Sequence, residues 1–138
     1  MLMVDKNLIL QISQALVKEP KIKLAYVLGS VVSGKLKLDS DFDLAIVVDN
    51  KDKIDFKFVY SLISHIKFPK NLDLSIVDKN SSPLFLFQIA STGECIYRQS
   101  EEEKVAFEAF VLKNYYDTAH MRSIYYSYLK DKFHHANQ

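Results

Sequence analysis

The chain lacks three features that would place it outside the cell or in a membrane. It has a single cysteine, Cys95, which cannot form a disulfide within the chain, so a reducing compartment is expected. The start MLMVDKNLIL has neither the basic region nor the small-residue cleavage site of a secretory signal. No apolar run approaches the length of a membrane span. These absences predict a cytoplasmic protein.

An excess of one charge is also absent, since 18 Lys and Arg stand against 17 Asp and Glu. Without a net field, binding of nucleic acid through bulk charge is not expected. The 138 residues, of which 49% are hydrophobic and 25% charged, suit one soluble globular domain. We find no repeat and no dividing linker. The sequence therefore predicts a single domain over residues 1–138, with a core at 5–98 and a helical extension at 100–132.

Helical and strand patterns alternate along that domain. Apolar residues at helical spacing predict helices over residues 5–18, 54–66 and 83–90, the first capped by Asp5. Period-two patterns predict strands over 22–28, 42–48, 72–77 and 95–97, the last at a sheet edge. The capping box formed by Ser100 and Glu103 starts one long helix that continues to about Lys130.

Three aspartates carry the chemistry that this pattern suggests. Asp41 and Asp43 lie two residues apart at the start of the 42–48 strand, so their side chains project to the same side. Carboxylate oxygens are the ligands that Mg²⁺ prefers. If the 72–77 strand is the neighbour, Asp73 lies on the same face and either binds a second metal ion or accepts a proton from an attacking hydroxyl. The set predicts metal-dependent nucleotidyl transfer with release of pyrophosphate.

A phosphate-binding turn is predicted between the first strand and the aspartates. Gly29 ends that strand and lets the backbone approach a phosphate, while Ser30 adds a hydroxyl donor. Lys35 and Lys37 follow in the loop and can neutralise the outer phosphates. Taken singly, the Gly-Ser pair is an ordinary turn, and the charged residues are solvated side chains. Their joint order and spacing favour the functional interpretation.

These residues resemble the signature of a known superfamily. The segment LGSVVSGKLKLDSDFDLAIVV is similar to that of the DNA polymerase β-like nucleotidyltransferases, and the aspartate of NLDLSIVD resembles their minimal nucleotidyltransferase (MNT) branch. The resemblance implies an α/β (α+β) fold with a small mixed sheet flanked by helices. It also implies that Gly29 and Ser30 bind the triphosphate and that Asp41, Asp43 and Asp73 bind Mg²⁺ and catalyse the transfer.

One departure from the superfamily pattern concerns the phosphate contacts. Many relatives have Ala-Arg-Gly after the Gly-Ser pair, where this chain has Val32-Ser33-Gly34. The arginine contact to phosphate is therefore absent. Lys35 or Lys37 would have to replace it.

The resemblance also implies a biological role. MNT proteins of this size resemble the antitoxins of HEPN/MNT toxin–antitoxin pairs, which transfer AMP from ATP to a tyrosine of a HEPN ribonuclease. ATP, a two-metal Mg²⁺ site and a hetero-oligomer with a HEPN toxin are therefore expected. An antibiotic-type nucleotidyltransferase is the alternative, although such enzymes generally add a helical domain that closes the acceptor pocket. A binding module without catalysis is a third possibility, and the presence of all three carboxylates argues against it.

The C-terminal helix carries more apolar residues than one sheet can cover. One stripe at helical spacing is expected to pack on the sheet: Phe107, Phe110, Val111, Met121, Tyr125 and Leu129. Four further residues lie outside that stripe: Leu112, Tyr116, Tyr126 and Tyr128. A helix that is apolar on more than one side is usually buried on more than one side, so these residues predict contact with another chain.

Overall fold

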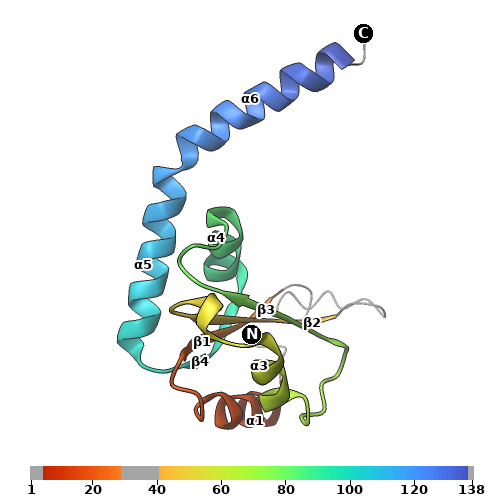
Figure 1. Ribbon diagram of the computed structural model, residues 1–138, viewed down its shortest axis with the longest axis vertical. Coiled ribbons are helices and arrows are strands. Elements are labelled where there is room, and N and C mark those ends of the chain that lie inside the picture. The colour runs from red at the N-terminus through yellow and green to blue at the C-terminus, as the bar shows by residue number, and fades with distance from the viewer. Residues whose placement is uncertain (1–4, 29–40, 137–138) are drawn as a thin grey trace.

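The computed structural model describes residues 5–28 and 41–136, which form a mixed sheet with helices on both faces (Figure 1). The strands are β1 (Ile22–Leu28), β2 (Phe42–Val48), β3 (Leu72–Val77) and β4 (Glu94–Arg98). The helices are α1 (Lys6–Leu16), α3 (Phe56–Ile63), α4 (Pro83–Thr92), α5 (Glu101–Asp117) and α6 (Ala119–Ala136), with a short 3₁₀ turn, η1 (Lys51–Lys53). This arrangement confirms the expected α/β fold.

The sheet has the strand order β3-β2-β1-β4. β1 pairs antiparallel with both β2 and β4, and β2 pairs parallel with β3. A parallel pair requires a crossover connection, which η1 and α3 provide between β2 and β3. β2 and β3 are therefore neighbours, which is the condition that the sequence analysis set for bringing Asp73 to the other aspartates.

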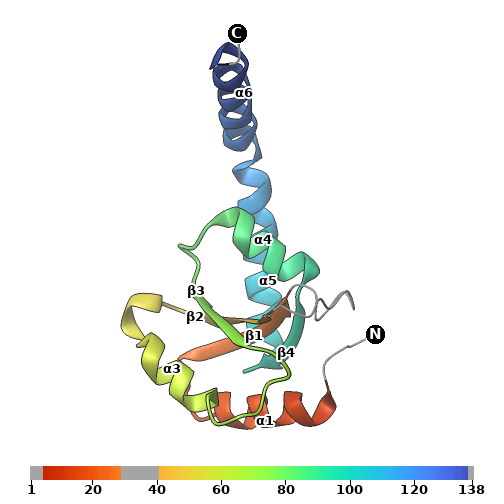
Figure 2. The ribbon, with the colours of Figure 1, turned by 90° about the vertical axis from the view of Figure 1, so that its right-hand side faces the viewer.

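Two layers of helices bury the two faces of the sheet (Figure 2). Alternate residues of β2, such as Phe42 and Leu44, belong to the core cluster under α1 and α3. The residues between them, Ala45 and Val47, belong to the cluster under α4 and α5. Both faces of the central strands are therefore covered, which explains why β2 is apolar at every position after Asp43.

Side-chain caps fix where the helices begin. Asp5 accepts a hydrogen bond from the backbone amide of Asn7 at 3.2 Å and starts α1, as predicted. Ser82 caps α4. The Ser100 hydroxyl accepts from the amide of Glu103 at 3.1 Å, so α5 begins at the predicted capping box. The helix expected over 54–66 is shorter at both ends, because Asp55 caps the start of α3 at Phe56 and the C-cap Ser64 ends it at Ile63.

The single helix expected over 100–132 is two helices that meet at Thr118. The Thr118 hydroxyl donates hydrogen bonds to the carbonyls of Asn114 and Tyr115, at 2.8 and 3.2 Å. The Arg122 guanidinium donates to the same Tyr115 carbonyl at 2.8 Å. Side-chain donors thus compete with backbone donors at this point, which is a recognised cause of helix interruption.

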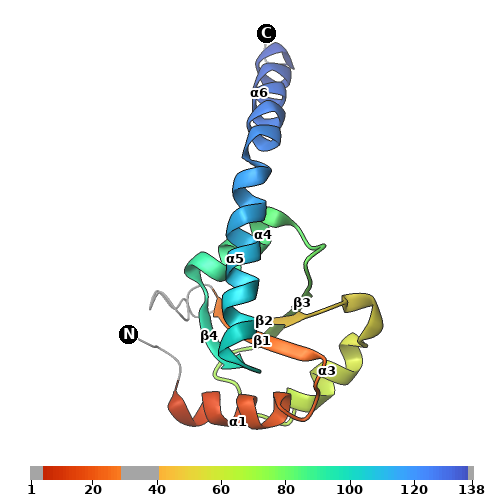
Figure 3. The same ribbon diagram turned by 90° about the vertical axis from the view of Figure 1, so that its left-hand side faces the viewer.

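α6 leaves the body of the protein after that interruption (Figures 1 and 3). Phe107 and Val111 of α5 are buried under the sheet, as predicted. The expectation that Met121 and Tyr125 also pack on the sheet is wrong, since they are 69% and 60% exposed. The helical spacing of apolar residues continues into α6, but the sheet does not extend far enough to lie beneath them. Among the described helices, none has the length and apolar character needed to cross a membrane.

Candidate functional site

Two of the predicted aspartates lie side by side at one end of the parallel strand pair. Asp43 of β2 and Asp73 of β3 are partners in the register of the two strands. Neighbouring strands lie about 4.8 Å apart, so the two side chains start within reach of each other. Asp41 precedes β2 directly and is exposed, as is Asp73, whereas Asp43 is half-buried. The predicted carboxylates therefore lie together at an end of the strand pair that solvent can reach.

The aspartates at the start of β2 and β3 bring several negative charges close together. Burial raises the pKa of Asp43 above its ordinary value, and the neighbouring Asp73 raises it further through its charge and a hydrogen bond. The charge of Asp41 acts in the same direction. Like charges held together disfavour ionisation, and a bound cation reverses that effect. The three carboxylates thus repel one another when no ligand is bound, and a bound cation would relieve that repulsion.

The donor set fits Mg²⁺, although it is small. Within residues 5–28 and 41–136, no group of three or more His, Cys, Asp or Glu residues is arranged to hold a metal ion. Mg²⁺ is commonly bound by one or two carboxylates together with substrate phosphates, and the Asp43 and Asp73 pair meets that need. The wider ligand set that includes Asp41 stays a prediction.

The strand that leads into the predicted phosphate-binding turn ends beside these carboxylates. Leu28, the last residue of β1, is the register partner of Asp43. The chain therefore leaves β1 next to the half-buried carboxylate. Gly29, Ser30, Lys35 and Lys37 lie outside the described residues, and their roles stay predictions.

Gly93 holds the end of α4 against this end of β1, a role that the sequence analysis missed. A β-carbon at position 93 would lie 2.4 Å from the carbonyl oxygen of Ile89 and 2.8 Å from Cδ2 of Leu28. Real β-carbons do not approach so closely, so only glycine permits this contact. The sequence showed a glycine between a helix and an edge strand, but its packing partner is distant in the chain. Gly93 thus supports the strand end from which the predicted turn departs.

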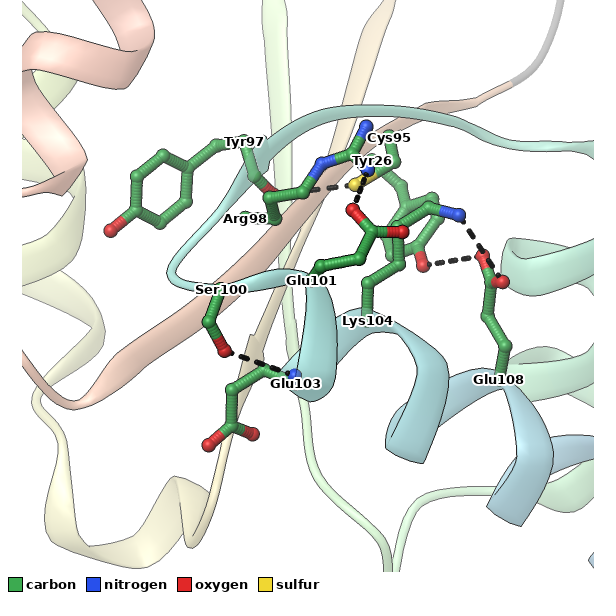
Figure 4. Close-up of polar contacts among 9 residues, drawn as sticks. All are labelled: Tyr26, Cys95, Tyr97, Arg98, Ser100, Glu101, Glu103, Lys104 and Glu108. Atoms are coloured by element: carbon green, nitrogen blue, oxygen red, sulfur yellow. Dashed lines mark hydrogen bonds and ion pairs between the residues drawn. The ribbon is translucent and has the colours of Figure 1, made fainter.

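A polar network, also missed by the sequence analysis, fastens α5 to β1 (Figure 4). The hydroxyl of Tyr26 donates a hydrogen bond to Glu108 at 3.0 Å, and the Lys104 ammonium lies 3.3 Å from the other Glu108 oxygen. Burial raises the pKa of Tyr26 far above its usual range, so the phenol stays neutral. Burial also raises the pKa of the nearby Cys95 thiol, which makes it a poor nucleophile. We infer that this network positions α5 against β1 and takes no part in the chemistry.

The family model described as "Polymerase beta, Nucleotidyltransferase" matches residues 10–102, which is more than half of the chain. This match confirms the superfamily that the aspartate and Gly-Ser pattern predicted. No curated protein sequence matched the chain.

Solved structures similar to this one include toxin–antitoxin complexes. A crystal structure of a double mutant of the toxin–antitoxin MntA-HpeT has a TM-score of 0.68 at 18% identity, covering 94% of this chain and 99% of that chain. A toxin–antitoxin structure with AMP-PNP has a TM-score of 0.66 at 20% identity, covering 94% and 99%. The tri-AMPylated HEPN toxin of Shewanella oneidensis in complex with its MNT antitoxin has a TM-score of 0.60 at 18% identity, covering 93% and 98%. At these identities the likeness establishes the fold.

Proposed function

Because the chain belongs to the polymerase beta nucleotidyltransferase family, we propose that it is an antitoxin that transfers AMP from ATP to a tyrosine of a HEPN ribonuclease toxin and so neutralises it. The observation that carries the proposal is the pairing of Asp43 with Asp73 at the solvent-accessible start of the parallel strands β2 and β3, with Asp41 directly before β2. Three solved relatives support the choice of acceptor, since they are toxin–antitoxin complexes, one with AMP-PNP and one with an AMPylated HEPN toxin.

The proposed reaction is an in-line displacement at the α-phosphorus of ATP. The tyrosine oxygen forms a new bond to phosphorus, the bond from that phosphorus to the bridging oxygen breaks, and pyrophosphate leaves. Asp41, Asp43 and Asp73 would hold Mg²⁺, which supplies neutralisation of the triphosphate charge. Asp73 is exposed, so an incoming hydroxyl can reach it. The phenol proton passes to Asp73 where Asp73 acts as the base, and to solvent where Asp73 instead shares the ion.

The fold contributes rigidity to this site. Asp43 is fixed by β2, which is hydrogen-bonded to a strand on each side, and its partner Asp73 is fixed by β3. A site carried by strands holds its side chains more closely than a site carried by loops. We propose further that this chain and the toxin form a hetero-oligomer, in which the toxin is the acceptor of AMP.

The test measures label transfer from α-labelled ATP with Mg²⁺ to the purified product of the adjacent reading frame, which the proposal expects to be a HEPN protein, with intact-mass spectrometry to locate AMP on a tyrosine. We expect Asp41→Ala, Asp43→Ala and Asp73→Ala each to lower transfer at least about a thousandfold. The melting temperature of each variant should equal or exceed that of the wild type, because the substitution removes like-charge repulsion.

Asp49→Ala is the matched control, because Asp49 follows the opposite end of β2 and is exposed. It should transfer AMP as the wild type does. Near-wild-type transfer by Asp43→Ala would contradict the proposed site. AMP on an aminoglycoside, with none on the HEPN protein, would instead assign the antibiotic-type activity.

A further inference from the structure

α6 exposes its large apolar side chains on a helix that leaves the body of the protein (Figure 3). We call these residues the α6 surface, and each is between 54% and 69% exposed: Met121, Ile124, Tyr125, Tyr126, Tyr128 and Phe133. Scattered exposed apolar residues are ordinary, but six large ones on a single projecting helix exceed that pattern and mark an interaction site. None of the described α6 side chains up to His134 is buried.

The α6 surface continues into a groove beside α4. A cavity of about 340 Å³ lies where the start of α4 faces the joint between α5 and α6. Pro83 and Leu84 line it from α4, and Met121 and Tyr125 line it from α6. Leu84 is itself 48% exposed. A partner lying along α6 therefore finds an apolar seat at the base of the helix.

The joint holds α6 in a defined direction. The Tyr115 ring stacks on Phe87 of α4 with centroids 3.8 Å apart and planes 13° apart. The Arg122 guanidinium lies over the Tyr115 ring, 4.0 Å from its centroid, and also donates a hydrogen bond to the Tyr115 carbonyl. These contacts restrict the direction of α6 before a partner arrives, which lowers the entropic cost of binding.

Charge and residue distribution decide what kind of partner fits. α6 carries Arg122, Lys130 and Lys132 against a single acidic residue, Asp131. A second copy packed through the same helix would place like charges together, which disfavours it. Apolar residues on several sides, rather than on one face, do not suit a helix that lies flat on a lipid surface. They suit a helix inserted between other helices, with acidic residues at the rim.

The groove also lies on the same side of the sheet as the carboxylates. α4 packs with Ala45 and Val47, which share the sheet face of Asp43 because they alternate with it along β2. The end of α4 reaches Leu28 at Gly93, and its start lines the groove. A protein seated in the groove therefore lies on the carboxylate side of the sheet.

We propose that α6, with the groove at the start of α4, is the docking surface for the acceptor protein, and that this acceptor offers an apolar groove between helices with an acidic rim. The inference rests on the proposed function and adds the surface and the chemistry of the partner. Docking and transfer are separable, since the docking residues belong to α6 and the reacting carboxylates to β2 and β3.

The experiment measures the affinity of the full chain for the purified product of the adjacent reading frame, which the proposed function expects to be the HEPN acceptor. Tyr125→Ser with Tyr128→Ser should weaken binding at least tenfold, because central aromatic residues dominate interface energies. The control is Phe56→Ser with Tyr60→Ser on α3, an exposed aromatic pair on the opposite sheet face, which should change binding less than twofold. Lys130→Glu with Lys132→Glu should weaken binding at low salt, and Lys57→Glu should not.

Transfer measured on the same samples separates this inference from the proposed function. The tyrosine variant should raise KM for the acceptor and leave kcat at saturation unchanged. A wild-type chain that binds through α6 and transfers nothing contradicts the proposed function alone. Wild-type binding and transfer in the tyrosine variant overturn the docking surface alone. A dimer of this chain that the tyrosine variant dissociates, or adsorption to phosphatidylglycerol vesicles that it abolishes, also overturns it.

Discussion

α5 and α6 are nearly equal in length and aromatic content, yet only α5 contributes to the core. α5 has 17 residues and α6 has 18, and each carries four aromatic residues. Phe107 and Val111 of α5 are buried, while the aromatic residues of α6 are exposed. Composition therefore does not determine the fate of either helix. The difference lies in what each helix can reach.

Distance along the chain explains that difference. α5 starts directly after β4, so its first turns are held against the sheet, where Phe107 packs on Tyr26 with ring centroids 5.9 Å apart. A helix of this length spans about 25 Å, which is comparable to a strand of the sheet. α6 begins beyond that span. The body of the chain, as far as the structure describes it, offers no surface that covers the exposed apolar residues of α6, so they are available to another protein.

The largest expected effect is on the free energy of unfolding, when one aromatic residue of each helix is replaced by alanine. Phe107→Ala removes a buried ring and should lower the free energy of unfolding by about 3 to 5 kcal/mol. Tyr125→Ala, at an exposed position of the other helix, should change it by less than about 0.5 kcal/mol. Both free energies are obtained from urea denaturation. Similar losses in the two variants would show that α6 packs on the body in solution and would end the comparison.

An intermediate effect concerns pH and two tyrosines, one from each environment. Burial raises the pKa of Tyr26 far above the value of about 10 that it has in an unfolded chain. Because the folded pKa is the higher one, the stabilisation is complete below about pH 10 and is lost as pH rises above it. The loss amounts to about 1.4 kcal/mol per pH unit.

Stability measured between about pH 10 and 11 should therefore fall less steeply in Tyr26→Phe than in the wild type. Tyr128→Phe is the control, because Tyr128 is 61% exposed and should leave the slope unchanged. Equal slopes in the wild type and Tyr26→Phe would mean that the phenol ionises as readily in the folded protein as in the unfolded chain.

Local patterns were sufficient to predict the body of the fold. The strands β1, β2 and β3 were predicted at their observed bounds, because each apolar stretch is bounded by polar residues or a glycine in its own sequence. The caps Asp5 and Ser100 marked helix starts through contacts two or three residues away. The aspartate pair followed once β2 and β3 were neighbours.

Features that depend on distant contacts were not predictable in the same way. Helical periodicity shows which residues share a face, but not whether a sheet lies beneath that face, so Met121 and Tyr125 were wrongly assigned to the core. The constraint on Gly93 comes from Leu28, which is far away in the chain. Each of these required the fold itself.

The smallest expected effect lies at the joint between the two helices. Arg122→Gln removes the guanidinium from the Tyr115 ring and its donor to the Tyr115 carbonyl, both at a half-buried position. Such contacts stabilise by about 0.5 to 1 kcal/mol, so the free energy of unfolding should barely change. The direction of α6 should nevertheless become less restricted, with faster hydrogen exchange in the first two turns of α6 and unchanged exchange at Phe107. Lys113→Gln, which breaks an exposed ion pair with Asp117 within α5, is the control and should leave α6 unaffected. Unchanged α6 exchange in Arg122→Gln would mean that the helix backbone alone sets its direction, and the contrast between the two helices would then owe nothing to the joint.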